Sequence, residues 1–300
     1  MKHIFILNPV AGKGRGKTFE NIKKEIASAC QKLNIEPIIH ITENADDARY
    51  FSRNTCLDEK DHVRFYACGG DGTLNQVANG IFGFSNTSLG CIPIGSGNDY
   101  VKNFHNHDFL NIEKQLNGNT VKVDVIKVHE RICINIANIG FDADVGYGVN
   151  TFRRFPFING NAAYNLSLVT RLIHKLGVNM RIRVDGEYID NHLFLLAAFG
   201  KGSYYGGHFK ALTHANLSDG MMDICAVKKV SRLTIAGFSK VYAKGNHIEA
   251  LPNLIEYRKA KSVQIFAKNP LKVCIDGEIF SMINPTFNVI PKAINFIIPE

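Results

Sequence analysis

GGDGTLNQVANG occupies residues 69–80 and directly follows the apolar run VRFYAC at 63–68, which is typical of a buried strand. An apolar stripe at helical spacing follows at Leu74, Val77, Ala78 and Ile81. Glycines at such a junction let the backbone approach a ligand closely, and a helix N-terminus supplies N–H groups for an anion. Thr73 can cap the helix or donate to a phosphate. The stretch therefore predicts a strand, a tight loop and a helix that together bind a phosphate.

The segments on either side repeat this alternation of strand and helix. Short apolar runs predict strands at 3–7, 37–42, 63–70 and 89–95. After the first of them, a helical stripe consists of Phe19, Ile22, Ile26, Ala29 and Leu33. The alternation predicts an N-terminal α/β domain with a parallel sheet over residues 1–127. Ligands of such sheets bind at the carboxyl ends of the strands.

Two more glycine-bearing loops are expected at that edge of the sheet. NPVAGKGRGKT at 8–18 follows the first strand, and PIGSGNDYVKN at 93–103 follows the fourth. Residues 11–18 also fit A-x-x-x-x-G-K-T, a relaxed P-loop in which Lys17 touches phosphates and Thr18 a magnesium ion. The motif begins with Ala, however, and a glycine-rich turn without a ligand is a further alternative. Three glycine loops at successive strand ends indicate a nucleotide phosphate site.

The pattern changes after about residue 120, where short Val- and Ile-rich segments alternate with turn residues. This pattern predicts an antiparallel β-sandwich domain over residues 128–289. Helical patterns interrupt it at 164–176 and 232–245. The last segment, within 290–300, is expected to be a strand that returns to the first domain.

The motif IDGE at 275–278 carries two carboxylates, Asp276 and Glu278, two residues apart. On a strand this spacing points both side chains to one face. Neighbouring carboxylates raise the pKa of one of them, which suits a general base near neutral pH. A hairpin turn built on Asp-Gly is the alternative. VDGE at 184–187 has the same letters, and we interpret it as an ordinary turn.

Composition limits the class of partner. The chain has 300 residues, of which 45 % are hydrophobic, and a formal net charge of +8, so it is globular and suited to an anionic partner. It lacks a DNA-reading motif, so we expect no nucleic acid. Seven cysteines without C-x-x-C spacing predict buried thiols of a cytosolic protein.

A membrane surface is one anionic partner that the sequence favours. No apolar run reaches the ~18–20 residues of a membrane span. FRRFPFI at 152–158 could dip into an anionic membrane surface or form a buried connector. We therefore expect a cytoplasmic protein that associates transiently and peripherally with the membrane. Exposed edge strands of the sandwich make a homodimer plausible.

Taken together, the motifs resemble those of the diacylglycerol kinase catalytic-domain family, which includes bacterial soluble lipid kinases and sphingosine and ceramide kinases. The resemblance rests on NPVAG, GGDGTLNQVANG and PIGSGND, and continues through 135–145, 203–224 and 273–278. It implies a nucleotide-kinase-like α/β domain plus a β-sandwich domain, with the active site in the cleft between them. The implied activity is transfer of the γ-phosphoryl group of ATP to a lipid hydroxyl, with diacylglycerol as the first candidate.

The resemblance also implies roles for individual residues. The ATP site would comprise Asn8, Pro9, Val10, Ala11, Gly12, Thr42, Gly69, Gly70, Asp71, Gly72, Thr73, Leu74, Asn75 and Ser96. Asp71 and Asp99 would belong to an acidic network that holds the catalytic Mg²⁺. Glu278 would be the general base, with Asp276 as its partner. ANLSDGMMD at 215–223 would hold a structural Mg²⁺ through the Asp219 carboxylate and the carbonyls of Asn216 and Met221, with an Asp-Gly turn as the alternative.

The chain departs from the family pattern at a few positions. His208 and Thr213 stand where the family has a glycine and a proline, and Gln76 replaces a frequent Glu. An NAD kinase-like enzyme shares GGDGT but is not expected to have the other two motifs. A nucleotide-binding regulator without turnover is a further alternative, although the four acidic residues of the implied active site are intact.

Overall fold

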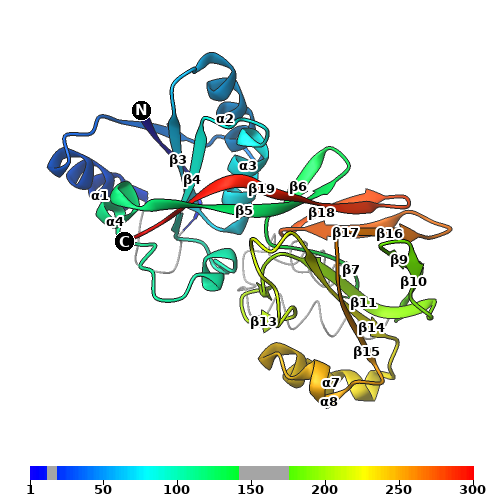
Figure 1. Ribbon diagram of the computed structural model, residues 1–300. Helices are drawn as coiled ribbons and strands as arrows, with labels where there is room; N and C mark the ends of the chain where they lie inside the picture. Colours follow the sequence, from blue (N-terminus) through cyan, green and yellow to red (C-terminus); the bar gives the residue numbers. More distant parts are fainter. Residues whose placement is uncertain (12–18, 142–175) are drawn as a thin grey trace. The chain divides into compact units, whose positions relative to one another are not determined.

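The computed structural model describes residues 1–11, 19–141 and 176–300 (Figure 1). They form two compact units. Unit 1 contains Met1–Val125, Leu217–Gly220 and Ile290–Glu300, and unit 2 contains Ile126–Asn216 and Met221–Val289. The segment 152–158, and all but the last residue of the helix expected at 164–176, lie outside the described residues.

Unit 1 is built on a parallel sheet with the strand order β2-β1-β3-β4-β19. Its strands are β1 (Lys2–Leu7), β2 (Pro37–Ile41), β3 (Val63–Gly69), β4 (Thr87–Pro93) and β19 (Thr286–Ile298), the last of which also supplies residues to unit 2. Every residue of β3 is buried, as expected for a central strand covered on both faces. Phe296 of β19 pairs with Leu89 of β4, so the last strand extends the sheet.

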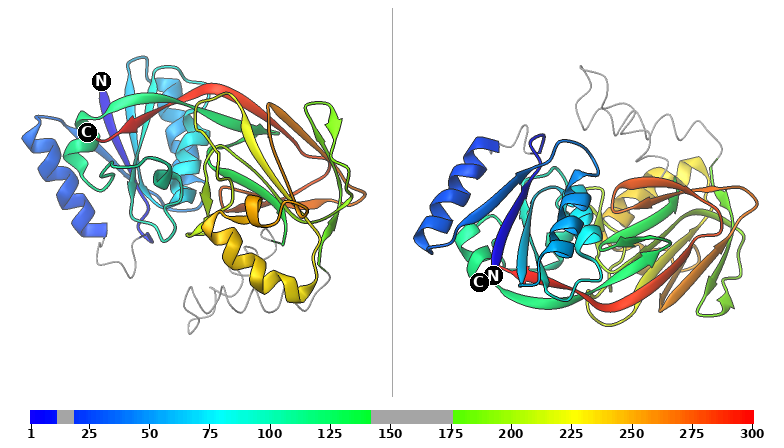
Figure 2. Two further views of the ribbon diagram at one scale, coloured as in Figure 1. Left: turned by 60° about the horizontal axis from the view of Figure 1, so that its bottom comes forward. Right: turned by 90° about the horizontal axis from the view of Figure 1, so that it is seen from above.

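Helices cover both faces of this sheet (Figures 1 and 2). They are α1 (Phe19–Lys32), α2 (Asp47–Asp58), α3 (Asp71–Ile81) and α4 (Ile112–Asn117), with a 3₁₀ turn η1 (Tyr100–Asn103) before α4. α1 buries Ile22 and Ile26 against Phe5 and Tyr66 of the sheet. On the other face α2 and α3 pack closely, because Gly80 has no Cβ. A Cβ at this position would lie 2.6 Å from the Arg49 carbonyl oxygen.

Unit 2 contains two antiparallel arrays of strands. One has the order β15-β14-β11-β7-β17-β18, with β8 beside β11, and the other includes β10-β9-β16-β19. Their bounds are β7 (Ile136–Gly140), β8 (Val178–Asn179), β9 (Arg181–Val184), β10 (Glu187–Tyr188), β11 (Leu193–Gly200), β14 (Met222–Lys228), β15 (Ile255–Ala260), β16 (Ser262–Phe266), β17 (Leu271–Ile275) and β18 (Glu278–Met282). Residues from both arrays share one buried core. In this core the rings of Phe199 and Phe287 stack with their centres 4.7 Å apart. The predicted fold class, an α/β domain with a parallel sheet plus an antiparallel β domain, is confirmed.

The remaining elements complete the two units. They are β5 (Asn119–Val128), β6 (Arg131–Cys133), β12 (Tyr204–Tyr205), β13 (Phe209–Lys210), α7 (Arg232–Lys244) and α8 (His247–Ala250). α7 lies against the outer face of the β11-containing sheet (Figure 2), where Ile235 and Tyr242 join Leu196 and Val227 in a second core. Ser231 caps the start of α7 by accepting a hydrogen bond from the Thr234 N–H.

All seven cysteines lie in the described residues, and each is a buried thiol outside any disulfide. This confirms the sequence-based prediction for their burial. Among the described residues, no helix has the length and hydrophobicity needed to cross a bilayer.

Candidate functional site

Three of the predicted loops meet at the carboxyl edge of the unit 1 sheet. The carbonyl oxygen of Gly69 accepts hydrogen bonds from the N–H groups of Ile94 and Gly95 at 2.9 and 3.1 Å, which joins the loops after β3 and β4. The amide nitrogen Nδ2 of Asn8, after β1, donates to the hydroxyl of Thr73 at 3.2 Å. The structure therefore brings Asn8, the GGDGT segment and the start of the PIGSG loop together.

The glycines of these loops serve two purposes. A Cβ at Gly95 would lie 2.3 Å from the Cα of Gly70, and one at Gly69 would lie 2.3 Å from the Thr73 hydroxyl oxygen, so these two glycines allow loop to pack on loop. A Cβ at Gly72, in contrast, would meet no atom of the described residues within 4 Å, and Gly72 is exposed. Among the glycines of these loops that the structure describes, Gly72 has the open surroundings that the close approach of a ligand requires.

The first turn of α3 has the properties of an anion site. Gly70 is the N-cap residue, has an extended conformation, and carries no side chain that could cap the helix. The first intrahelical bond of α3 runs from the Leu74 N–H to the Gly70 carbonyl at 3.1 Å. N–H groups ahead of that bond point outward along the positive end of the helix dipole. This end of α3 is therefore suited to a phosphate.

Two carboxylates flank the same loops. Oδ1 of Asp71 accepts a hydrogen bond from the Tyr100 N–H at 3.0 Å, and Oδ1 of Asp99 pairs with Nζ of Lys102 at 2.5 Å. Their other oxygens converge on Gly97: a Cβ at that position would lie 2.9 Å from Oδ2 of Asp71 and 3.2 Å from Oδ2 of Asp99. A side chain at Gly97 would therefore crowd an oxygen of each carboxylate, and glycine avoids this.

This pair of oxygens fits Mg²⁺, which takes one or two protein carboxylates and completes its octahedron with waters and substrate phosphates. Within the described ranges, no group of three or more His, Cys, Asp or Glu residues is arranged to hold a metal ion.

The other residues predicted for the ATP site differ in how exposed they are. Val10 is 65 % exposed, Ser96 is exposed, and the Thr42 N–H donates to the Leu7 carbonyl at 2.9 Å at the end of β2. The side chains of Leu74 and Asn75 are buried in α3, so these two can offer a ligand little more than backbone. Pro9 and Ala11 are half-buried in the loop after β1, and Gly12 lies outside the described residues.

The IDGE motif forms a tight hairpin in unit 2, between β17 and β18. Ile275 pairs with Glu278, and the two residues between them have φ values of +46° at Asp276 and +92° at Gly277, which is the pattern of a type I′ turn. The prediction that both carboxylates point to one face of a strand is wrong, because Asp276 lies in the turn. VDGE forms the same kind of turn, with φ +44° at Asp185, and its interpretation as a turn is confirmed.

Asp276 is buried and engaged by backbone. Its Oδ2 accepts from the Ile134 N–H at 2.7 Å, and its Oδ1 accepts from the N–H groups of Asn135 and Ile136 at 3.0 Å each. The thiol of Cys133 lies 3.1 Å from Oδ1. Negative charge at Asp276 raises the pKa of this thiol beyond the larger effect of its burial. Asp276 therefore fixes the hairpin to the 133–136 segment.

Glu278 has a different environment. Its Oε2 lies 3.2 Å from a guanidinium nitrogen of Arg131, and its side chain is 30 % exposed. The Arg131 guanidinium also lies over the ring of Phe280, 4.5 Å from its centre. Arg131 thus orients the Glu278 carboxylate. Sequence reasoning missed Arg131 because it lies 147 residues away along the chain, within no motif.

The loop predicted to hold a structural Mg²⁺ has residues in both units: Leu217–Gly220 belong to unit 1, and Asn216 and Met221 belong to unit 2. In unit 1, Asp124 accepts from the Gly220 N–H at 2.7 Å and donates its own N–H to the Leu217 carbonyl at 2.7 Å. In unit 2, the carbonyl oxygen of Met221 accepts a hydrogen bond from the ammonium group of Lys201, a residue with 0 % exposure. The assignment of Asn216, Asp219 and Met221 as metal ligands stays a prediction.

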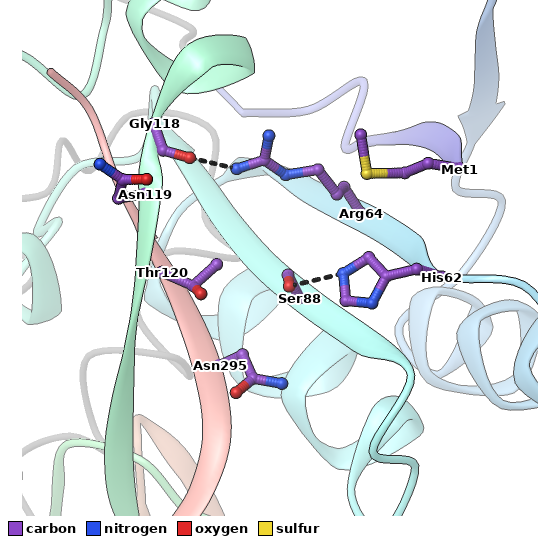
Figure 3. A pocket seen from close by; sticks show the side chains of 8 residues that line it. All are labelled: Met1, His62, Arg64, Ser88, Gly118, Asn119, Thr120 and Asn295. Carbon is purple, nitrogen blue, oxygen red and sulfur yellow. Dashed lines mark hydrogen bonds between the residues drawn. The ribbon is translucent and has the colours of Figure 1, made fainter.

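A hollow of about 420 Å³ lies at the opposite, amino-terminal edge of the unit 1 sheet (Figure 3). Arg64 lines it and donates to the Leu116 carbonyl at 2.7 Å and to the Gly118 carbonyl. His62 contacts the Ser88 hydroxyl at 2.9 Å, and burial lowers its pKa, with Arg64 adding to the effect. Since His62 and Arg64 stand at the start of β3, this hollow is separate from the glycine loops at the strand's end.

Comparison with known protein families accounts for both units. The diacylglycerol kinase catalytic domain matches residues 2–128, and the YegS C-terminal NAD kinase beta sandwich-like domain matches residues 135–298. This chain belongs to the diacylglycerol kinase catalytic-domain family. The predicted resemblance is thereby confirmed across both halves of the chain.

Members of this family match the chain over nearly its full length. Relatives named diacylglycerol kinase are 29 % identical in Staphylococcus carnosus, over 98 % of this chain and 94 % of the relative, and 28 % identical in Bacillus subtilis, over 98 % and 95 %. A crystal structure of a diacylglycerol kinase from Bacillus anthracis has a TM-score of 0.72 at 22 % identity, covering 99 % of this chain and 96 % of that one. An NAD kinase of Archaeoglobus fulgidus in complex with ATP has a TM-score of 0.50 at 11 % identity, covering 99 % and 93 %, which is a likeness of fold.

Proposed function

We propose that this protein is an ATP- and Mg²⁺-dependent lipid kinase that transfers the γ-phosphoryl group to a lipid hydroxyl, with diacylglycerol as the first substrate to test. One observation carries the proposal: the first turn of α3, which starts at a glycine N-cap and contains the open Gly72, lies in the same loops as the Asp71 and Asp99 carboxylates. Phosphoryl transfer depends mainly on positioning and charge stabilisation, which such loops can supply.

In this proposal the ATP phosphates approach the backbone at Gly72 and the start of α3. The loop after β1, which contains Asn8, and the loop after β4, which contains Ser96, form the rest of the nucleotide site. Hydrogen bonds from these loops to the loop after β3 keep them in place. Asp71 and Asp99 would hold Mg²⁺ in the space beside Gly97. The ion would neutralise the phosphate oxygens.

We assign the general base to Glu278 and a positioning role to Asp276. Both oxygens of Asp276 accept backbone N–H groups, so this carboxylate is occupied as an anchor for the turn. Glu278 follows that turn directly and is partly exposed, with Arg131 holding one of its oxygens. A carboxylate placed in this way can accept the proton of an attacking hydroxyl.

The lipid substrate is inferred from the relatives and from charge. The near full-length relatives are named diacylglycerol kinases, and the net charge of +8 favours an approach to an anionic membrane surface. We propose a peripheral association, in which the protein draws its substrate from the bilayer without spanning it.

Transfer of labelled γ-phosphate from ATP, with Mg²⁺, to lipids in mixed micelles tests the proposal. The panel holds diacylglycerol, sphingosine, ceramide and undecaprenol, with NAD as a soluble acceptor. Label on a lipid supports a lipid kinase and identifies its substrate. Label on NAD, or ATP binding with no transfer to any acceptor, contradicts it and favours an NAD kinase-like enzyme or a regulator.

A pair of glycine variants tests the position of the phosphates within the same assay. Gly72→Ala adds a methyl group in open space at the start of α3, so it should leave the fold intact and raise the KM for ATP. Gly237→Ala is the matched control, since Gly237 is also an exposed helical glycine without a positive φ and with no atom of the described residues within 4 Å of its Cβ position, but lies in α7 of unit 2. An unchanged KM for ATP in Gly72→Ala would place the phosphates elsewhere.

A further inference from the structure

Lys201 is a fully buried lysine in unit 2, directly after β11, with 0 % of its surface exposed. Its backbone N–H donates to the Asn135 carbonyl at 2.9 Å, which fixes the start of the side chain. A buried ammonium group is costly unless polar partners surround it, so its location in a protein requires an explanation. No motif of the family resemblance gave this residue a role.

The ammonium group of Lys201 donates to the carbonyl oxygen of Met221. That oxygen is one of the three ligands expected for a structural Mg²⁺, and Met221 lies two residues after Asp219, the only carboxylate among them. A carbonyl oxygen that binds Mg²⁺ must lie within about 2.1 Å of the ion. An ammonium on the same oxygen would place a second positive charge beside a divalent cation, and the two would repel.

We propose that the Lys201 ammonium takes the place of a structural Mg²⁺ at the carbonyl oxygen of Met221, so that the 216–221 loop does not bind a metal ion. An ammonium supplies donors and one positive charge, which a carbonyl oxygen such as that of Met221 accepts in place of a metal ion. The inference concerns the architecture of unit 2 and is independent of the lipid that the enzyme phosphorylates.

Melting temperatures test the proposal without any measurement of activity. The quantity of interest is the Mg²⁺ increment, defined as the melting temperature in Mg²⁺ minus that in EDTA, measured without nucleotide. Asp219→Asn should have the same increment as the wild-type protein, because no ion is bound at the loop. Lys201→Arg, which keeps the positive charge, should also leave it unchanged.

Lys201→Ala removes the internal cation and opens the carbonyl of Met221 to a metal ion. Its melting temperature in EDTA should fall, and its Mg²⁺ increment should exceed that of the wild type, by about 5–10 °C at a Mg²⁺ concentration 100 times the dissociation constant. Lys259→Ala is the matched control. It removes a lysine that lies 3.4 Å from a buried carboxylate of unit 2, Asp223, and should lower stability without raising the increment.

Binding of Mn²⁺ measured by electron paramagnetic resonance gives a second readout. Wild type and Asp219→Asn should bind the same number of ions, and Lys201→Ala should bind one more. The proposal is overturned if Asp219→Asn loses an ion or an increment that the wild type has, or if folded Lys201→Ala gains neither. Should Lys201→Ala fail to fold, the Asp219→Asn comparison alone decides.

Discussion

Replacing Asp276 by Asn isolates the hydrogen bonds that anchor the IDGE hairpin. Asn accepts the left-handed conformation that Asp276 adopts at φ +46°, so the type I′ turn itself is preserved. The side chain keeps its shape but loses its charge and one acceptor. Whichever way the amide is turned, its NH₂ group must face at least one of the buried N–H donors at Ile134, Asn135 and Ile136.

The magnitude follows from these contacts. If the amide oxygen takes the place of Oδ1, it keeps the bonds from Asn135 and Ile136 and loses the one from Ile134, which is the shortest at 2.7 Å. A buried donor left without a partner costs about 1–3 kcal/mol, and the remaining bonds lose their charge assistance. We expect the free energy of unfolding to fall by about 3 kcal/mol.

Asp185→Asn is the matched control because Asp185 occupies the same position of the second D-G-E turn. Its Oδ1 accepts from the N–H groups of Lys261 and Ser262 at 3.1 and 2.8 Å, and an amide oxygen can retain both bonds. The side chain is exposed, so the loss should stay below about 1 kcal/mol.

Urea unfolding followed by circular dichroism measures both losses, and hydrogen exchange locates them. In Asp276→Asn the amides of residues 134–136 should exchange faster, while in Asp185→Asn they should not. If Asp276→Asn loses no more stability than Asp185→Asn, or if those amides stay protected, then Asp276 is not the anchor of this hairpin.

Three further predictions concern two glycines and one buried histidine. Gly97→Ala puts a methyl group between two carboxylate oxygens, so it should raise the Mg²⁺ concentration needed for half-maximal activity while the protein stays folded; an unchanged requirement would move the metal elsewhere. Gly95→Ala forces a Cβ to within 2.3 Å of backbone and should cost about 2–3 kcal/mol in urea unfolding, against less than about 1 kcal/mol for Gly72→Ala. Burial lowers the pKa of His247 to about 4, so its contribution to stability is complete above about pH 6.5 and falls by about 1.4 kcal/mol per pH unit toward pH 4. His247→Gln should flatten that dependence, and an equally steep loss in the variant would contradict the cause.

The sequence predicted the first unit well because its signals are local. Each strand is a short apolar run, each helix has a stripe at 3.6-residue spacing, and the glycine loops lie between them along the chain. Parallel strands place their carboxyl ends at one edge, so the meeting of the Asn8, Gly69 and Gly95 loops follows from topology.

The contacts within those loops depend on geometry that a motif does not carry. Gly69 and Gly95 fall in motifs associated with phosphate, yet each makes room for neighbouring loop atoms, whereas Gly72 has open surroundings among the described residues. The motif GGDGTLN predicts Leu74 as part of the ATP site, but the side chain of Leu74 is buried in α3.

Unit 2 was harder to predict because its important pairs are distant in sequence. Asp276 contacts the 133–136 segment, and Glu278 contacts Arg131, across about 140 residues of chain. The two-residue spacing of the carboxylates suggested a strand, whereas Asp-Gly at the centre of a two-residue hairpin specifies a turn. Lys201 carries no local signal, and only its burial identifies it.

The central claim, that Glu278 takes the proton of a lipid hydroxyl during phosphoryl transfer from ATP, is tested most directly by one comparison of rates. The rate of transfer of labelled phosphate to diacylglycerol is measured for Glu278→Gln and for Glu187→Gln, the same change in the second D-G-E turn, where the side chain is 83 % exposed. Loss of a general base should lower kcat by about 10²–10⁴-fold in Glu278→Gln, with ATP binding retained, and Glu187→Gln should match the wild type. Equal rates for the two variants would contradict the account.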